Sequence, residues 1–327
     1  AIAHWFSTWI GPTPLALSLA LGIVSGQTFD LLRERLERSR LHHQFRRFVS
    51  RDVADSLVND PSIYQHAALG RKRRVVVMFS DLRGFTSLSE KITPEQLFAQ
   101  LNEYLSAMVK IIFAHGGTLD KFIGDAILAH WGALENGDET TFSNSALAAA
   151  QAMTAGLDEL NSSWKSRGLP ELEMGIGLHL GDVLAGEIGS EQRTEFGVIG
   201  DAVNLASRLE GLTKVFGCPY LASRHFIAAL PPANINHLHR IAKVRVKGRQ
   251  EPLDVWAPAC CEAAKPSFAQ ALELFESGEF DNAVEFLEEY LKQFIDDHTA
   301  RHLLEKTHLF SKTRPTDWQG IIEFSDK

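Results

Sequence analysis

Residues 74–89 read Arg-Val-Val-Val-Met-Phe-Ser-Asp-Leu-Arg-Gly-Phe-Thr-Ser-Leu-Ser, and they decide the fold of the central part of the chain. The apolar first half is typical of a short buried strand. Asp81 ends this strand, and Gly84 and Thr86 lead from it towards a helix. Such a turn presents free backbone N–H groups to phosphate oxygens, and the carboxylate beside it suits a divalent cation. An aspartate that merely caps the helix is the alternative.

A second acidic side chain lies in a predicted tight turn. Residues 120–126 read Asp-Lys-Phe-Ile-Gly-Asp-Ala, and the apolar runs Thr118–Ile123 and Ala126–Trp131 on either side predict a hairpin. Carboxylates of Asp81 and Asp125 at the ends of adjacent strands can hold two Mg²⁺ ions a few ångströms apart. Because Gly-Asp is common in hairpins, plain turn chemistry is the alternative.

A third motif predicts a helix with two polar side chains on one face. Residues 197–210 read Gly-Val-Ile-Gly-Asp-Ala-Val-Asn-Leu-Ala-Ser-Arg-Leu-Glu. Asn204 and Arg208 are four residues apart, so they share a helix face. An amide and a guanidinium on one face can hold a sugar and a phosphate. A solvated helix face is the alternative.

The order of elements around these motifs indicates an α+β domain over residues 71–258, with a mainly antiparallel sheet. Between the hairpin and the third motif, Met174–His179 and Val183–Glu187 are expected to form a strand pair that turns at Gly181-Asp182. The other predicted elements are helices over about Thr93–His115, Thr141–Arg167 and from Ala202, and strands over His237–Val246 and Leu253–Trp256.

A largely apolar segment precedes this domain. The stretch Trp9–Phe29 reaches the roughly 20 residues that a bilayer-spanning helix needs. Positive charge beside such a span favours the cytosolic side, and four arginines follow: Arg33, Arg35, Arg38 and Arg40. We therefore expect residues 1–29 to be the last transmembrane helix of a larger protein in the inner or cell membrane, with the catalytic part cytoplasmic. A buried helix and a signal peptide are the alternatives.

Two further helical segments flank the domain. Residues 30–70 form a predicted signal-transducing linker, which can pair two chains as a coiled coil or lie as a single amphipathic helix on its own domain. Residues 259–327 predict short antiparallel helices that resemble one tetratricopeptide-like unit, although a single unit makes no repeat architecture. A formal net charge of −8 argues against nucleic-acid binding.

Taken together and in this order, the three motifs make the chain resemble the class III adenylyl/guanylyl cyclase family, in particular bacterial members with a membrane-anchored input region. The resemblance covers about residues 75–257. It implies a ferredoxin-like catalytic domain and an adenylate cyclase, which converts ATP into 3′,5′-cyclic AMP and pyrophosphate.

The resemblance also implies roles for individual residues. Asp81 and Asp125 match the metal-binding aspartates, which implies two Mg²⁺ or Mn²⁺ ions in each active site. Lys121 matches the lysine that reads the adenine ring. Asn204 matches the asparagine that orients the ribose, and Arg208 matches the arginine that stabilises charge on the α-phosphate. Further substrate contacts are expected from Gly84, Phe85, Thr86, Arg193, Gly197 and Lys247.

Gly197 departs from the family pattern. Adenylyl cyclases of this kind usually carry threonine, serine or aspartate there, and that side chain receives the adenine amino group. A backbone carbonyl or a water can replace this hydrogen bond, which leaves more of the base selection to Lys121. A guanylate or pyrimidine-nucleotide cyclase on the same fold is therefore the nearest alternative.

Two other functions receive less support. A catalytically silent cyclase-like binding module would usually have lost a metal aspartate or the arginine, and none is lost here. A diguanylate cyclase would carry a Gly-Gly-Asp/Glu-Glu-Phe signature, which this sequence lacks.

The resemblance implies an assembly as well. In the family, the metal-binding aspartates come from one subunit and the residues matching Lys121, Asn204 and Arg208 from the other. This chain carries both sets, so we expect a homodimer with two equivalent composite sites. The predicted partners are thus ATP, a second copy and the membrane, with no nucleic acid.

Overall fold

The computed structural model describes residue 29 and residues 70–85, 92–134, 137–190, 193–246, 249–259 and 264–324. The predicted membrane span and the predicted linker lie outside these ranges, apart from Phe29 and Gly70, as do Thr86 and Lys247. Of Arg193 only the backbone is described. Within the described ranges, none of the helices has the length and apolar character needed to cross a bilayer.

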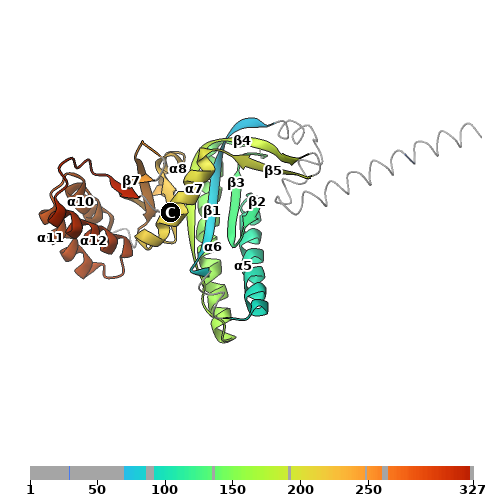
Figure 1. Cartoon of the computed structure of the whole chain (residues 1–327), viewed down its shortest axis with the longest axis horizontal. Helices are drawn as coiled ribbons and strands as arrows, with labels where there is room; N and C mark the ends of the chain where they lie inside the picture. The colour runs from blue at the N-terminus through green and yellow to red at the C-terminus, as the bar shows by residue number, and fades with distance from the viewer. Residues whose placement is uncertain are drawn as a thin grey trace, which may run out of the picture.

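One mixed sheet runs through the described part of the chain (Figure 1). Its strands are β1 Arg71–Arg83, β2 Thr118–Ile123, β3 Ala126–Trp131, β4 Glu173–Ser190, β5 Arg193–Ile199, β6 Tyr220–Ser223, β7 Leu238–Val246, β8 Leu253–Pro258 and β9 Ile322–Phe324. The strand order is β2-β3-β1-β4-β6-β8-β7-β9, and β5 pairs with β4. Among the described pairs, β4–β6 and β7–β9 are parallel and the others antiparallel. The predicted α+β fold class is confirmed.

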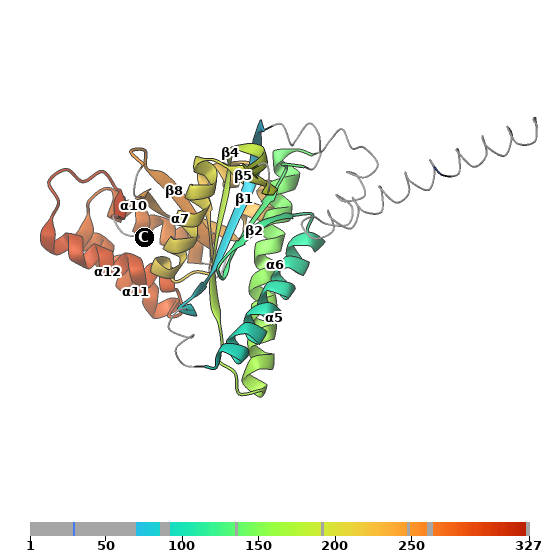
Figure 2. The same ribbon diagram turned by 45° about the vertical axis from the view of Figure 1, so that its right-hand side comes forward.

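Helices cover both faces of this sheet (Figure 2). They are α5 Pro94–Ala114, α6 Glu139–Ser166, α7 Asp201–Phe216, α8 Arg224–Ala228, α9 Pro232–Ile235, α10 Lys265–Glu276, α11 Phe280–Gln293 and α12 His298–Thr313. A capping box starts α5: Gln96 N donates to Thr93 Oγ1, and Thr93 N donates to the Gln96 side chain. These bonds satisfy backbone donors that would otherwise lack partners.

The apolar run of β1 serves both faces. Val76 and Met78 pack into one core cluster with side chains of α5 and α6. Val75 and Val77 point the other way and pack with Ala202 and other side chains of α7. Because successive side chains of a strand alternate between its faces, a strand covered on both sides must be apolar throughout.

The predicted strand pair around Gly181-Asp182 is wrong. The structure has a single continuous strand, β4, which pairs along its length with the long strand β1. Gly181 is needed for close packing rather than for a turn, because a Cβ there would lie 2.9 Å from the Cβ of Ala202 on α7. Asp182 pairs across the strands with Lys72 at 2.9 Å.

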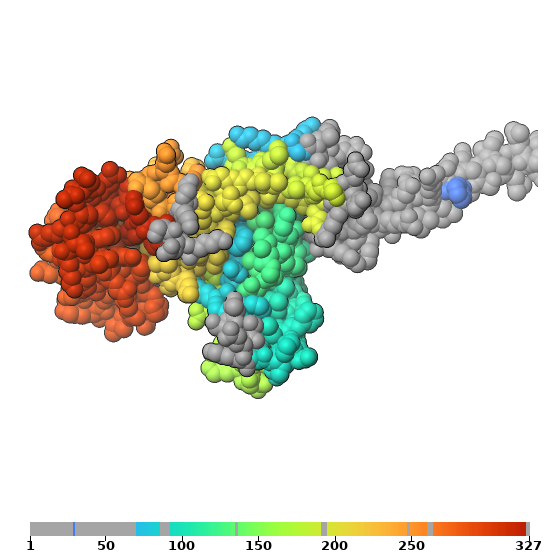
Figure 3. All heavy atoms as spheres, viewed as in Figure 1, coloured from blue at the N-terminus to red at the C-terminus, as the bar shows by residue number. Residues whose placement is uncertain are grey.

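The C-terminal helices form a lobe at one end of the molecule (Figure 3). Side chains of α10, α11 and α12 share a core cluster with α7, β7 and β8. Arg240 on β7 donates to Glu276 on α10 at 2.9 Å, and Thr299 on α12 donates to the carbonyl of Phe216 at 3.2 Å. The domain boundary at residue 258 and the tetratricopeptide-like character of the lobe stay predictions.

Close contact between β4 and α7 gives a test of this packing. A Cβ at Gly177 would lie 2.0 Å from the carbonyl oxygen of Ala206 on α7. We therefore expect Gly177→Ala to lower the free energy of unfolding by about 1–3 kcal/mol, because backbone must move. Urea titration followed by circular dichroism measures this change.

Gly211→Ala is the matched control. Gly211 lies on α7 with nothing near its missing Cβ, and alanine favours a helix interior by about 0.5–1 kcal/mol. Unchanged stability of Gly177→Ala would contradict the close packing of α7 on β4.

Candidate active site

The two predicted metal ligands meet at one end of the sheet. Asp81 lies near the end of β1. Asp125 lies in the turn between β2 and β3, where Gly124 has a φ of 68°, a conformation that favours glycine. Because β3 pairs antiparallel with β1, with Ser80 opposite Ile127, the start of β3 brings Asp125 beside Asp81.

Burial and the neighbouring charge of Asp125 perturb Asp81. The pKa of Asp81 is raised to about 6, first by burial and then by the negative charge of Asp125 and a hydrogen bond with it. The hydrogen bond that Leu82 N donates to Asp81 Oδ1, at 3.0 Å, acts in the opposite direction. Like charges this close destabilise each other's ionised form, and a bound cation would relieve that cost.

A third carboxylate, which the sequence analysis did not assign, faces the pair. The pKa of Glu210 on α7 is raised to about 7, first by burial and then by Asp81, with a smaller contribution from Asp125, whereas Arg83 lowers it. Glu210 ends the third motif, two residues beyond Arg208. Two residues turn about 200° around a helix, so Glu210 points to the opposite side from Arg208. A glutamate two residues after Arg208 was therefore the sequence feature that could have identified this third carboxylate.

The donor set fits a cation that shares its ligands with a substrate. In the described ranges, no group of three or more His, Cys, Asp or Glu side chains is arranged to hold a metal ion. Mg²⁺ typically binds through one or two carboxylates plus waters and substrate phosphates. Asp81 and Asp125 therefore fit Mg²⁺ or Mn²⁺ better than they fit a structural metal enclosed by protein.

The predicted ribose and phosphate residues lie on α7. Asn204 is exposed and Arg208 is half-buried. In the part of the chain that the structure describes, no hydrogen bond or ion pair joins either of them to Asp81 or Asp125. Within the described part of one subunit, the two predicted residues of α7 are thus not bonded to the acidic pair.

The predicted base-reading residues come together around a residue that the sequence analysis did not assign. Lys121 on β2 and Gly197 on β5 both lie against Asp120. The Lys121 Nζ is 3.1 Å from Asp120 Oδ1, and a Cβ at Gly197 would lie 3.0 Å from Asp120 Oδ2. A buried aspartate directly before the predicted lysine was the sequence signal for this contact.

The other predicted substrate contacts are less completely described. Gly84 is exposed just after β1, with a φ of 67°. Phe85 is half-buried and packs against the core beside α5. The backbone of Arg193 pairs with Ser190 at the tip of the β4–β5 hairpin.

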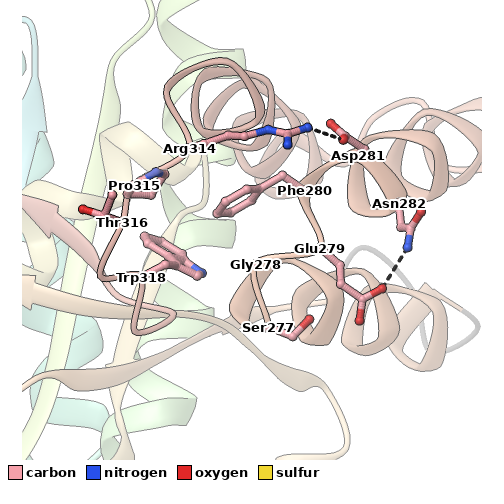
Figure 4. Close-up of a pocket in the computed structure, with 10 residues that line it drawn as sticks. All are labelled: Ser277, Gly278, Glu279, Phe280, Asp281, Asn282, Arg314, Pro315, Thr316 and Trp318. Carbon is pink, nitrogen blue, oxygen red and sulfur yellow. Dashed lines mark hydrogen bonds and ion pairs between the residues drawn. The ribbon is translucent and has the colours of Figure 1, made fainter.

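A surface pocket lies away from these residues, on the C-terminal lobe (Figure 4). Phe280 and Trp318 line it, and Arg314 beside them pairs with Asp281 at 2.9 Å. None of the predicted site residues lines this pocket. The acidic pair, rather than the pocket, is therefore the candidate active site.

Comparisons with known proteins agree with the fold. The family model of the adenylate and guanylate cyclase catalytic domain matches residues 68–255. Over 185 residues, the chain is 40% identical to an adenylate cyclase of Anabaena cylindrica, and the match covers 56% of this chain and 36% of that protein. Adenylate cyclase 1 of Rhizobium meliloti is 34% identical over 185 residues, and the match covers 57% of this chain and 27% of that protein. The matched parts thus span about a third of these relatives or less.

Solved structures give the same result. The crystal structure of an adenylyl cyclase from P. aeruginosa is 29% identical, with a TM-score of 0.54, and covers 59% of this chain and 96% of that one. A guanylyl cyclase structure is 37% identical, with a TM-score of 0.53, and the match covers 58% of this chain and 93% of that one. Since the family model matches more than half of the chain, the chain belongs to the class III family of adenylate and guanylate cyclases.

Proposed function

We propose that this protein is an adenylate cyclase, which converts ATP into 3′,5′-cyclic AMP and pyrophosphate. The observation that carries the proposal is the placement of Asp81 beside Asp125 at the adjoining ends of β1 and β3, where burial first and then the charge of Asp125 raise the pKa of Asp81 to about 6. Two such carboxylates are suited to cations that bind together with a triphosphate. The adenylate cyclase relatives at 40% and 34% identity support ATP as the substrate.

The reaction is an in-line displacement within one nucleotide. The ribose 3′-oxygen attacks the α-phosphorus, and pyrophosphate leaves; the protein mainly positions the reacting groups and compensates charge. Asp81 and Asp125 would hold the divalent ions, which supply charge neutralisation and activation of the attacking hydroxyl when bound. Arg208 stabilises the charge that develops on the α-phosphate, and Asn204 orients the ribose.

The remaining predicted residues act away from the reacting centre. Lys121 reads the base. Lys247 holds the distal phosphates, and Arg193 adds a further phosphate contact. Gly84, Phe85 and Thr86 follow the first metal ligand in the sequence, and their backbone N–H groups would receive phosphate oxygens.

A homodimer would complete the site. No hydrogen bond or ion pair joins the acidic pair to Asn204 or Arg208 within the described part of one chain, which supports a composite site. Four apolar side chains of β2, β4 and β5 are about half exposed: Phe122 and Ile123 just before Asp125, and Leu184 and Ile199, which pair across β4 and β5. Large exposed apolar side chains of this kind are available for an interface. We propose that a second copy covers them.

The location of the protein remains a proposal from the sequence. Residues 1–29 would anchor it in the inner or cell membrane, and residues 30–70 would transmit a signal to the cytoplasmic catalytic domain. Neither segment belongs to the described residues beyond Phe29 and Gly70.

A guanylate cyclase is the second candidate. Gly197 lacks the side chain that usually receives the adenine amino group, and a guanylyl cyclase structure is 37% identical to this chain. Lys121 opposes this alternative, because guanylyl cyclases of the family usually carry glutamate at that position.

Product analysis distinguishes these candidates. We expect the purified protein with Mn²⁺ to form cyclic AMP from ATP and to form less cyclic product from GTP, CTP and UTP. Chromatography with mass spectrometry identifies each product. Cyclic GMP as the main product would replace the first candidate by the second, and absence of any cyclic product would contradict both.

Asp125→Ala tests the metal role. We expect turnover to fall by at least about 100-fold, because removing one ligand disrupts the site that orients and neutralises the triphosphate. Mg²⁺ with a non-hydrolysable ATP analogue should raise the melting temperature of the wild type but not that of the variant. Circular dichroism without ligands checks that the variant still folds. Turnover that persists in the folded variant would refute the assignment.

The burial of Asp81 beside the charge of Asp125 also predicts a pH dependence of stability. Because the folded-state pKa of Asp81 lies near 6, above its ordinary 3.8, ionising this carboxyl costs stability as the pH rises from about 4 to 6. In metal-free protein, Asp81→Asn should therefore be more stable than the wild type at pH 7.5, by about 1–2 kcal/mol after allowance for partial exposure. The difference should vanish near pH 4.

Urea titrations with a chelator at both pH values measure this difference. Mg²⁺ should stabilise the wild type but not Asp81→Asn. An Asp81→Asn protein that is less stable than the wild type at pH 7.5 would contradict the destabilising effect of the ionised Asp81 carboxylate.

A further inference from the structure

Asp120 occupies an irregular position in β2. The pairing of β2 with β3 shifts register between Leu119 and Lys121, so that Asp120 is left out of the ladder as a bulge. In a regular strand, neighbouring side chains point to opposite faces. A bulge changes the direction of the side chains around it, and bulges are common beside active sites. Here the bulge lets the Asp120 and Lys121 side chains meet at 3.1 Å.

The Asp120 carboxylate is fully buried, with 0% of its side chain exposed. Its Oδ2 accepts a hydrogen bond of 2.8 Å from Val198 N on β5, which lies alongside β2. Its Oδ1 accepts no hydrogen bond within the described part of the chain, so this oxygen faces the ammonium of Lys121. A buried carboxylate held in this way fixes its cationic partner, because separating the two would leave an uncompensated charge.

Gly197 provides the space that this carboxylate needs. A Cβ at position 197 would lie 3.0 Å from Asp120 Oδ2 and 3.2 Å from Oδ1. Gly197 is not among the glycines with positive φ, so its backbone does not require glycine. The missing side chain is therefore explained by the neighbouring carboxylate rather than by a turn.

We propose that Asp120 is a positioning residue for base selection. By holding Lys121 in place, its carboxylate compensates for the hydrogen-bond acceptor that a side chain at position 197 would supply. This inference rests on the proposed function and deepens it. Asp120 holds the ammonium of Lys121, which can only donate hydrogen bonds. Adenine offers an acceptor at N1, whereas guanine carries a proton there. An ammonium fixed opposite N1 of the base thus favours adenine over guanine, and it does so without a side chain at position 197.

Asp120→Asn is the main test. Asparagine has the same shape and keeps an acceptor for Val198 N–H, but it loses the charge that holds Lys121. With Mn²⁺ and the full chain, we expect the KM for ATP to rise about tenfold with kcat changed much less, and the preference for ATP over GTP to fall about tenfold. A purely structural role would lower stability but leave the preference unchanged, and that result would overturn the proposal.

Asp182→Asn is the matched control. Asp182 also pairs with a lysine, Lys72, at 2.9 Å, but it lies half exposed on β4. The preference for ATP over GTP should remain that of the wild type in this variant.

Position 197 gives an independent test by rescue. In the wild-type background, Gly197→Thr should raise the KM for ATP, because the new side chain displaces the carboxylate. In the Asp120→Ala background there is room for threonine, which then supplies the acceptor usual in the family. The double variant should therefore regain a preference for ATP that neither single variant has, whereas simply additive effects would overturn the proposal.

Binding separates this inference from the proposed function. Dissociation constants for ATP and GTP with Mn²⁺, measured by equilibrium dialysis, do not require turnover. A wild type that forms no cyclic product would contradict the proposed function alone. An equal ratio of the two constants in the wild type and in Asp120→Asn would overturn the role of Asp120, whatever product is formed.

Discussion

The pairing of β1 with β3 is the contact on which the candidate site depends, because it forces two carboxylates together against their repulsion. The free energy for this comes from the core beneath, where both faces of β1 are buried against helices. The ladder ends at the pair Ser80 and Ile127, directly beside Asp81 and two residues from Asp125, and so keeps the backbones of the two aspartates near each other. The sheet thus holds charge close together in the free protein, ready for cations and a triphosphate to compensate it.

Helix α7 is used on two sides. Its exposed Asn204 and half-buried Arg208 face away from the acidic pair of their own chain, whereas Glu210 faces that pair. Glycines of β4 let the helix approach the sheet closely enough for this arrangement. A single helix therefore contributes to the electrostatics of its own acidic pair and, in the proposed dimer, offers polar groups to the site of the second copy.

Much of this organisation could be predicted from local patterns. The hairpin of β2 and β3, the buried strand β1 and the helix α7 follow from apolar runs and turn residues, which act within a few residues. Gly181-Asp182 was misinterpreted as a turn, because the need of α7 for a glycine on β4 is a tertiary contact. The roles of Glu210 and Asp120 were not predicted for the same reason, because the groups that interact with them come from distant parts of the chain.

The parallel pairing of β9 with β7 has a consequence for the architecture of the whole chain. It ties the end of the described chain back into the sheet after three helices, of which α12 contacts α7 and α10 contacts β7. Leu209, Leu212 and Phe216 of α7 share a core cluster with side chains of these helices, so removing the lobe would expose part of this apolar surface to water. The lobe thus packs against the back of the helix that carries Arg208, and the described sheet gains its last strand only after the lobe's three helices.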